Sequence, residues 1–259
     1  MARMAGKIQT IAWYTFLENL YNRSLLVAGV VAVLAFLLAQ FLGALTIIES
    51  REYQHAFLGV VLRLSGVLLV SVIVVAGMMR EINEKRLQLT LGFDISRTTY
   101  LLGKFLGYAL VAAVVALTLT LPLWFSIPGG QVLAWGISAW CELLIVSMLA
   151  LICVFTFTHI TGALLALLAF YALARMMHAV QLMGHGVFFS DSSLSDSLIN
   201  HGLDFIAFVL PGLHYFADTD WLVYHTAHPG SLLPVLIQTL VYLGLLTAVA
   251  LFDLYRKNF

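Results

Sequence analysis

Long apolar runs, separated by short polar stretches, fill most of the chain. A helix needs about 20 predominantly apolar residues to cross the hydrocarbon core of a bilayer. Runs of that length cover residues 24–48, 57–79, 105–127, 132–158, 160–180 and 232–252. We therefore predict an all-α polytopic membrane protein with six transmembrane helices, folded as a single domain over residues 1–259.

Residues 1–23 precede the first apolar run and show helical periodicity. Polar side chains, among them Glu18 and Asn19, occupy one face, and Trp13 and Tyr14 are interspersed. This pattern is typical of an amphipathic helix that lies in the headgroup region of a membrane. We predict such an interfacial helix, with an apolar face made of Ile8, Ile11, Ala12, Phe16, Leu17, Leu20 and Tyr21.

Residues 181–233 interrupt the pattern before the last run. They are rich in Ser, Asp, His and Pro, and their one clear apolar stretch, residues 205–213, is too short to span a bilayer. We predict an extracytoplasmic segment that contains a half-buried or re-entrant helix at the membrane surface.

Composition agrees with a membrane location. The chain is 62% hydrophobic and 10% charged, with a mean hydropathy of +0.99, so a soluble fold would have too little polar surface to cover itself. The formal net charge is zero, which gives no field to attract nucleic acid. Cys141 and Cys153 lie in one apolar run, too far apart along a helix for a disulfide.

Cations beside the predicted spans fall almost entirely on one side. The other side has only Arg51, and cytoplasmic loops carry the excess of Lys and Arg in membrane proteins. Both termini and the loop over residues 80–104 are therefore predicted to be cytoplasmic. The cations on that side are Arg3, Lys7, Arg23, Arg80, Lys85, Arg86, Arg97, Lys104, Arg256 and Lys257.

Three charged residues fall within the predicted spans, where charge is costly to bury. Glu142 and Arg175 lie at similar depths in neighbouring antiparallel spans, so we predict that they form an ion pair. The pair either fixes helix register or lines a substrate path. Arg63 is near the outer end of its span, and we expect its side chain to reach the interface.

The loop over residues 80–104 has the pattern of a helix, a turn and a second helix. Polar residues open it, Gly92 permits a turn, and Asp94 or Ser96 can cap a helix that continues into the third span. Such an exposed, charged shape suits a soluble partner, although it also suits a solvated loop that only sets topology.

Catalytic and nucleotide-binding motifs are missing from the sequence. It has no GxSxG or HExxH, and Gly103-Lys104 lacks the glycine spacing of a phosphate-binding loop. We therefore expect no enzyme activity and no cofactor in this chain. His225 and His228 are three residues apart without further ligand spacing, which leaves an extracytoplasmic metal or haem site as an alternative to plain loop histidines.

Three stretches resemble ABC-2 type transporter permeases. The first is residues 84–104, with Leu89, Gly92, Ile95-Ser96-Arg97 and Tyr100-Leu101-Leu102-Gly103-Lys104. The second is the interval from Ile11-Ala12 to Asn22-Arg23, which is similar to that family's interfacial helix. The third is Leu210-Pro211-Gly212-Leu213-His214-Tyr215-Phe216, which resembles the segment before its last span. The chain departs from the family at Arg86-Leu87 and Asp94-Ile95, where a glycine and a proline are frequent.

The resemblance implies the transmembrane permease subunit of an ABC transporter, an exporter in a bacterial inner membrane. Two copies of the permease, or this chain and a different permease, would pair with two copies of a separate ATPase subunit that binds ATP and Mg²⁺. A coupling helix in the loop would dock on the ATPase, and an extracytoplasmic partner is possible in addition. Matching positions assign the ATPase contact to Glu84, Arg86, Gly92, Asp94, Ser96 and Arg97.

Few charges lie in the predicted spans, which favours a lipid-like or amphiphilic cargo over a small ion. Two other classes stay open. The chain could be a membrane scaffold without transport, with which no ATPase would co-purify. It could also be a membrane protein that handles metal or haem through its outer histidines.

Overall fold

The computed structural model describes residues 2–20, 24–45, 50–86, 95–184, 206, 210–213, 215–216, 220–223 and 229–256. All regular structure in these ranges is helical. The elements are α1 (Ala2–Leu20), α2 (Ser24–Leu45), α3 (Ser50–Asn83), α5 (Arg97–Thr120), the 3₁₀ helix η1 (Leu121–Phe125), α6 (Gly129–Thr156), α7 (Ile160–Gly184), α9 (Asp220–Val223) and α10 (Pro229–Arg256).

Within these ranges, five segments are long and apolar enough to cross a membrane: Gln54–Asn83, Arg97–Phe125, Gly129–Thr156, Ile160–Met177 and Gly230–Arg256. α2 adds a shorter apolar stretch, Leu26–Phe41. The predicted all-α membrane architecture is confirmed at this level. The helices of the second and third predicted spans are longer than the apolar runs, because α3 begins at Ser50 and α5 at Arg97.

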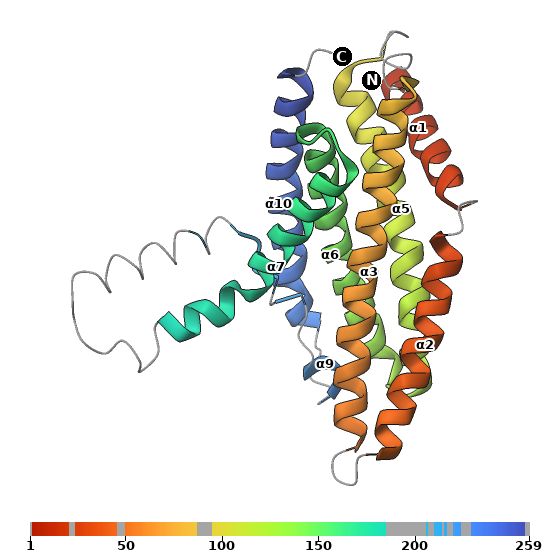
Figure 1. Ribbon diagram of the computed structural model, residues 1–259, viewed down its shortest axis with the longest axis vertical. Coiled ribbons are helices and arrows are strands. Elements are labelled where there is room, and N and C mark those ends of the chain that lie inside the picture. The colour runs from red at the N-terminus through yellow and green to blue at the C-terminus, as the bar shows by residue number, and fades with distance from the viewer. Residues whose placement is uncertain are drawn as a thin grey trace, which may run out of the picture.

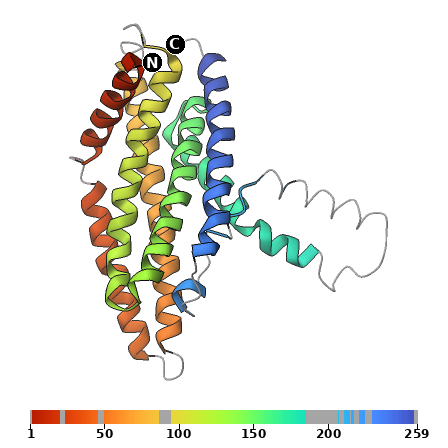
Figure 2. The same ribbon diagram turned by 180° about the vertical axis from the view of Figure 1, so that it is seen from behind.

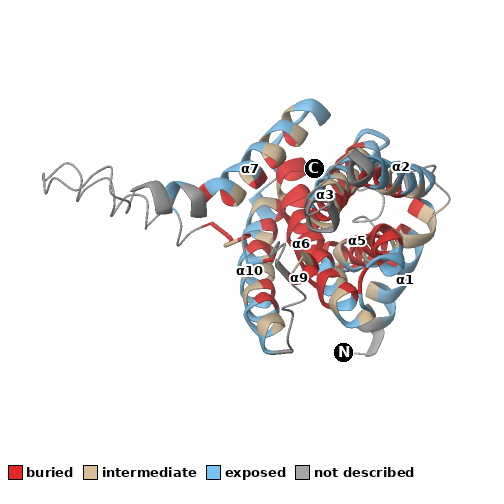
Figure 3. Ribbon diagram, turned by 90° about the horizontal axis from the view of Figure 1, so that it is seen from below, coloured by how far each residue is buried: buried red, intermediate tan, exposed pale blue. Residues whose placement is uncertain are grey.

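α6 is the central rod of the bundle. Residues 141–151 of this helix are all buried, and it packs against α3, α5, α7 and α10, as the view along the bundle shows (Figure 3). A helix that is apolar all round belongs in such an interior position. Cys141 and Cys153 are both buried there as free thiols.

α2 packs against α3 on the outside of the bundle. Small side chains recur along its buried face, which allows close approach between membrane helices, and leucines, valines and Phe41 cover its exposed face. The buried alanines are Ala28, Ala32, Ala35 and Ala39.

α1 is a helix, as predicted, but its packing face differs from the prediction. It runs alongside α5 (Figure 1) and buries Ala12, Thr15 and Asn19. Asn19 was expected on the polar face; its amide instead donates to the carbonyl of Thr15 at 2.8 Å. Gly103 and Gly107 of α5 explain the change, since a Cβ on Gly107 would lie 2.6 Å from that of Thr15.

α1 begins, α3 ends, α5 begins and α10 ends at one end of the bundle, which we call the basic end (Figure 1, Figure 2). α5 ends at the opposite end, where Pro122 replaces the last α-helical turn with η1. α7 diverges from the other helices toward its C-terminal end, as both side views show.

Candidate functional site

The basic end is built from the chain on either side of the predicted coupling loop. α3 ends before Lys85, whose φ of 58° is left-handed, and the amide of Lys85 donates to Ile82 O at 3.1 Å. Ser96 is the N-cap of α5, since its hydroxyl oxygen accepts from the amide of Thr99 at 3.2 Å. Gly92 and Asp94 lie outside the described residues, so their predicted turn and contact are untested.

Arg97 binds the end of α10. Its Nη1 donates to the carbonyl oxygens of Leu254 at 2.6 Å and Tyr255 at 3.2 Å, and its guanidinium lies 5.6 Å from the Tyr255 ring centroid. The last carbonyls of a helix lack partners within the helix and carry partial negative charge, so a cation stabilises them. Arg97 therefore links the start of α5 to the end of α10.

Glu84 and Arg86 belong to a partly exposed chain of charges. Glu84 accepts from Arg80 Nε at 2.8 Å and pairs with Arg86 Nε at 2.7 Å, and Arg86 reaches Glu18 of α1 at 3.6 Å. The hydrogen bond from Arg80 lowers the pKa of Glu84 from its ordinary value. Pairs this exposed contribute little to stability, and their donors remain accessible to a partner.

A second ion pair at this end is largely buried, and no sequence pattern predicted it. Lys104 pairs with Glu81, whose other carboxylate oxygen accepts from the Tyr100 hydroxyl at 2.8 Å. Lys104 was counted among the cations on the predicted cytoplasmic side, and it is buried, at 7% exposure. The pair joins α3 to α5 beside the residues at which α1 contacts α5.

A buried charge cluster lies deeper in the bundle, centred on Glu142 of α6. The structure brings the predicted pair within 3.8 Å, between Arg175 Nη1 and Glu142 Oε1. Tyr171, one helical turn before Arg175, donates its hydroxyl to the same Glu142 oxygen at 2.9 Å. Glu142 is completely buried, at 0% exposure.

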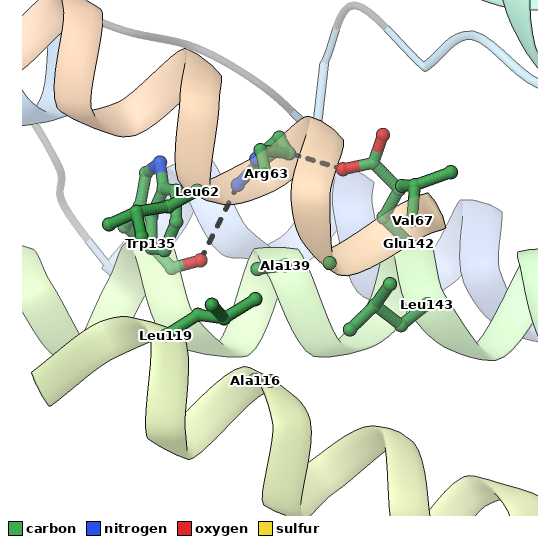
Figure 4. A pocket seen from close by; sticks show the side chains of 10 residues that line it. Leu62, Arg63, Val67, Ala116, Leu119, Trp135, Ala139, Glu142 and Leu143 are labelled. Carbon is green, nitrogen blue, oxygen red and sulfur yellow. Dashed lines mark hydrogen bonds and ion pairs between the residues drawn. The ribbon is translucent and has the colours of Figure 1, made fainter. Parts of the chain in front are cut away.

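The position of Arg63 differs from the sequence prediction. It was expected to reach the interface, but it is 5% exposed, lies 3.1 Å from Glu142 Oε2 and stacks 4.9 Å from the Trp135 ring centroid (Figure 4). Because α3 starts at Ser50, seven residues before the predicted span, Arg63 lies about 20 Å along the helix. The apolar run marks only residues 57–79, so it did not predict that the helix begins at Ser50.

The cluster holds a short irregular segment, residues 210–213 and 215–216, which we call the strap. Arg63 Nη1 and the Ser138 hydroxyl both donate to Phe216 O. Arg175 Nη1 donates to Leu213 O at 3.2 Å, and the Tyr242 hydroxyl donates to Leu210 O at 2.7 Å. Donors from four helices thus satisfy strap carbonyls, as buried non-helical backbone requires.

Two cavities lie near these helices. The one beside Arg63 and Glu142 has about 10 Å³ of room and is lined mainly by apolar side chains (Figure 4). A second, of about 560 Å³, is an apolar groove between α5 and α6, lined by Leu117, Leu121, Trp124, Ile137 and Trp140 among others. Within the described residues, no three His, Cys, Asp or Glu side chains group to hold a metal. His225 and His228 fall outside those residues.

The long apolar helices define the class: the chain is a multi-pass α-helical integral membrane protein. No model of a known protein family matches the sequence, and no curated protein matches it either. A more specific assignment therefore depends on the local resemblance and on the geometry of the two charged regions.

Proposed function

We propose that this chain is the permease subunit of an ABC-2 type transporter, with six spans and both termini in the cytoplasm. The observation that carries the proposal is the basic end. There Lys104 joins the two helices that flank the family-like loop, Arg86 links the end of α3 to α1, and Arg97 links α5 to α10. A partner that displaced the loop would thereby displace several helices together.

The energy source would be a separate subunit. The sequence has no phosphate-binding loop, and in the proposed assembly two permease copies contact two ATPase copies that hold ATP and Mg²⁺. Glu84, Arg86, Ser96 and Arg97, with Gly92 and Asp94 in the connecting loop, would form or position the contact surface. Arg86 and Glu84 offer exposed charges, whereas Ser96 and Arg97 hold α5 in place.

Export of an amphiphile from a bacterial inner membrane is the proposed direction and substrate class. The external faces of α2, α5 and α10 are apolar, and the groove between α5 and α6 is lined by apolar side chains. These surfaces suit a hydrocarbon chain better than a hydrated ion. The proposed cargo therefore carries an acyl or prenyl chain.

Purification of the tagged full chain from its native membrane tests the proposal. We expect a soluble chain with Walker motifs to co-purify in equal amount, and the assembly to hydrolyse ATP. Purification of the chain alone would favour a scaffold, and stoichiometric bound metal or haem would favour the histidine-based alternative. Either result would contradict the transporter assignment.

A further inference from the structure

We propose that the strap carbonyls occupy a binding site for an anionic head group, a phosphate or a carboxylate, made by Arg63 and Arg175. The inference rests on the proposed function, because it defines the polar end of the amphiphilic cargo. Arrival of the anion would displace Leu213 O and Phe216 O from the two guanidinium groups and free the strap.

Charge balance within the described cluster is the first support. Arg63 and Arg175 both face Glu142, the one carboxylate in the cluster. Tyr171 and Ser138 donate hydrogen bonds but carry no charge. The described cluster therefore has one cation in excess inside an apolar bundle, where an uncompensated charge is costly.

Hydrogen bonding is the second support. Carbonyl dipoles of Trp135, Leu213 and Phe216 supply the remaining acceptors for the two arginines. Arg63 Nε has no hydrogen-bond partner although it is buried, and neither has Glu142 Oε2, which faces Arg63 Nη1 at 3.1 Å. A phosphate or carboxylate adds an opposite charge and can accept two parallel bonds from one guanidinium, so an anion is a better partner for these donors than a neutral carbonyl.

Access is the third support. The strap carbonyls of Leu213 and Phe216 occupy the donors of Arg175 and Arg63. The cavity beside Arg63 has only about 10 Å³ of room, so an anion would have to take the place of these carbonyls. The side chain of Arg175 is 28% exposed, whereas that of Arg63 is 3% exposed. Arg175 lies on α7, the helix that diverges from the bundle toward its C-terminal end (Figure 1), and as the more exposed of the two arginines it would meet the anion first.

Binding of dodecyl phosphate to the purified full chain, in a neutral detergent, tests the site without any ATPase. Inorganic phosphate and dodecanol are the comparison probes, since they carry the head group or the chain alone. We expect dodecyl phosphate to bind and Arg175→Gln to weaken that binding about tenfold or more, the loss expected for a charged hydrogen bond. Arg175→Lys should restore part of it, and Arg80→Gln, which removes an exposed cation at the basic end, should have no effect.

Strap release needs its own readout. In a background with Cys141→Ala and Cys153→Ala, Leu213→Cys places a thiol at a position that is 2% exposed. We expect dodecyl phosphate to raise its rate of maleimide labelling about tenfold, the change that 1.4 kcal/mol of differential binding produces. Dodecanol should leave the rate unchanged.

Each outcome decides the proposal. If inorganic phosphate alone binds through Arg175, the site stands and its ligand is the free anion rather than a lipid head group. Equal effects of dodecanol and dodecyl phosphate, or binding of dodecyl phosphate that Arg175→Gln does not weaken, would overturn the proposal. The assay can fail while an ATPase still co-purifies, so the failure of this site is distinguishable from the failure of the transporter proposal.

Discussion

The two charged regions use the same residue types under opposite conditions. At the basic end, Arg80 and Glu84 have side chains 68% and 38% exposed, and water screens their attraction. Around Glu142, side chains of Arg63 and Glu142 are 3% and 1% exposed, so neither charge can be hydrated if its partner is lost. The comparison shows which charges can change partners readily and which hold the fold.

The largest effect is expected from Glu142→Gln. Loss of the carboxylate leaves Arg63 and Arg175 without a buried counter-charge, which should destabilise the protein by about 3–5 kcal/mol. Thermal unfolding in detergent would measure it. The double variant Glu142→Gln with Arg63→Met removes the fully buried pair and leaves only Arg175, whose side chain is 28% exposed, without a counter-charge, so it should regain much of the loss. A Glu142→Gln protein as stable as the parent would show that the cluster has no structural role.

Gly107→Leu should come next. Its side chain would collide with Thr15 and with the carbonyl of Ala12, and so separate α1 from α5. Overpacking of this kind costs about 1–3 kcal/mol. Gly244→Leu is the matched control, because a Cβ there meets nothing within 4 Å. Faster proteolysis of α1 in Gly107→Leu alone is the expected result, and equal proteolysis of both variants would contradict the packing.

Tyr100→Phe removes the hydroxyl that donates to Glu81 beside Lys104. A hydrogen bond to a charged group contributes about 1.5–3 kcal/mol, so a measurable drop in melting temperature should follow. Tyr14→Phe, at a side chain that is 69% exposed, serves as the control and should leave the melting temperature unchanged. Equal melting temperatures for the two variants would show that the Glu81 contact does not contribute to stability.

Arg97 should show a smaller effect on stability but a large one on coupling. Arg97→Gln removes a cation from the end of α10, an interaction of about 0.3–1 kcal/mol, and hydrogen exchange should speed up in the last turn of that helix. Arg97→Glu is expected to uncouple ATP hydrolysis from transport with membrane insertion unchanged. Full transport by that variant would count against the proposed contact.

The smallest effect is expected from Arg80→Gln at pH 7, because the pair with Glu84 is exposed. The pH dependence of this stability difference follows from the pKa of Glu84, which the hydrogen bond from Arg80 lowers. The contribution is present above the ordinary carboxyl pKa and disappears as pH falls through the lowered folded value. The parent should therefore be slightly more stable than Arg80→Gln at neutral pH, and the two stabilities should converge as pH falls through the folded-state pKa of Glu84. A stability difference that stayed the same in acid would contradict this assignment.

Much of the helical architecture could be read from the sequence, since apolar runs and the N-cap at Ser96 are local signals. The residues at which different helices contact one another could not be predicted in this way. The burial of Asn19 depends on glycines more than eighty residues away, and the deep position of Arg63 depends on where α3 starts. The Glu142–Arg175 pair could be predicted because both residues lie at similar depths in consecutive spans. The strap could not, because its contacts are made by backbone carbonyls, which every residue type has.

Cross-linking in intact membranes tests the central claim most directly. In the background without cysteines, Arg86→Cys places a thiol at the basic end, and Phe125→Cys, 84% exposed in η1, places one at the opposite end. The account predicts that a short bifunctional reagent joins Arg86→Cys, and not Phe125→Cys, to a chain with Walker motifs. A cross-link to such a chain from Phe125→Cys, or from neither position, would contradict it.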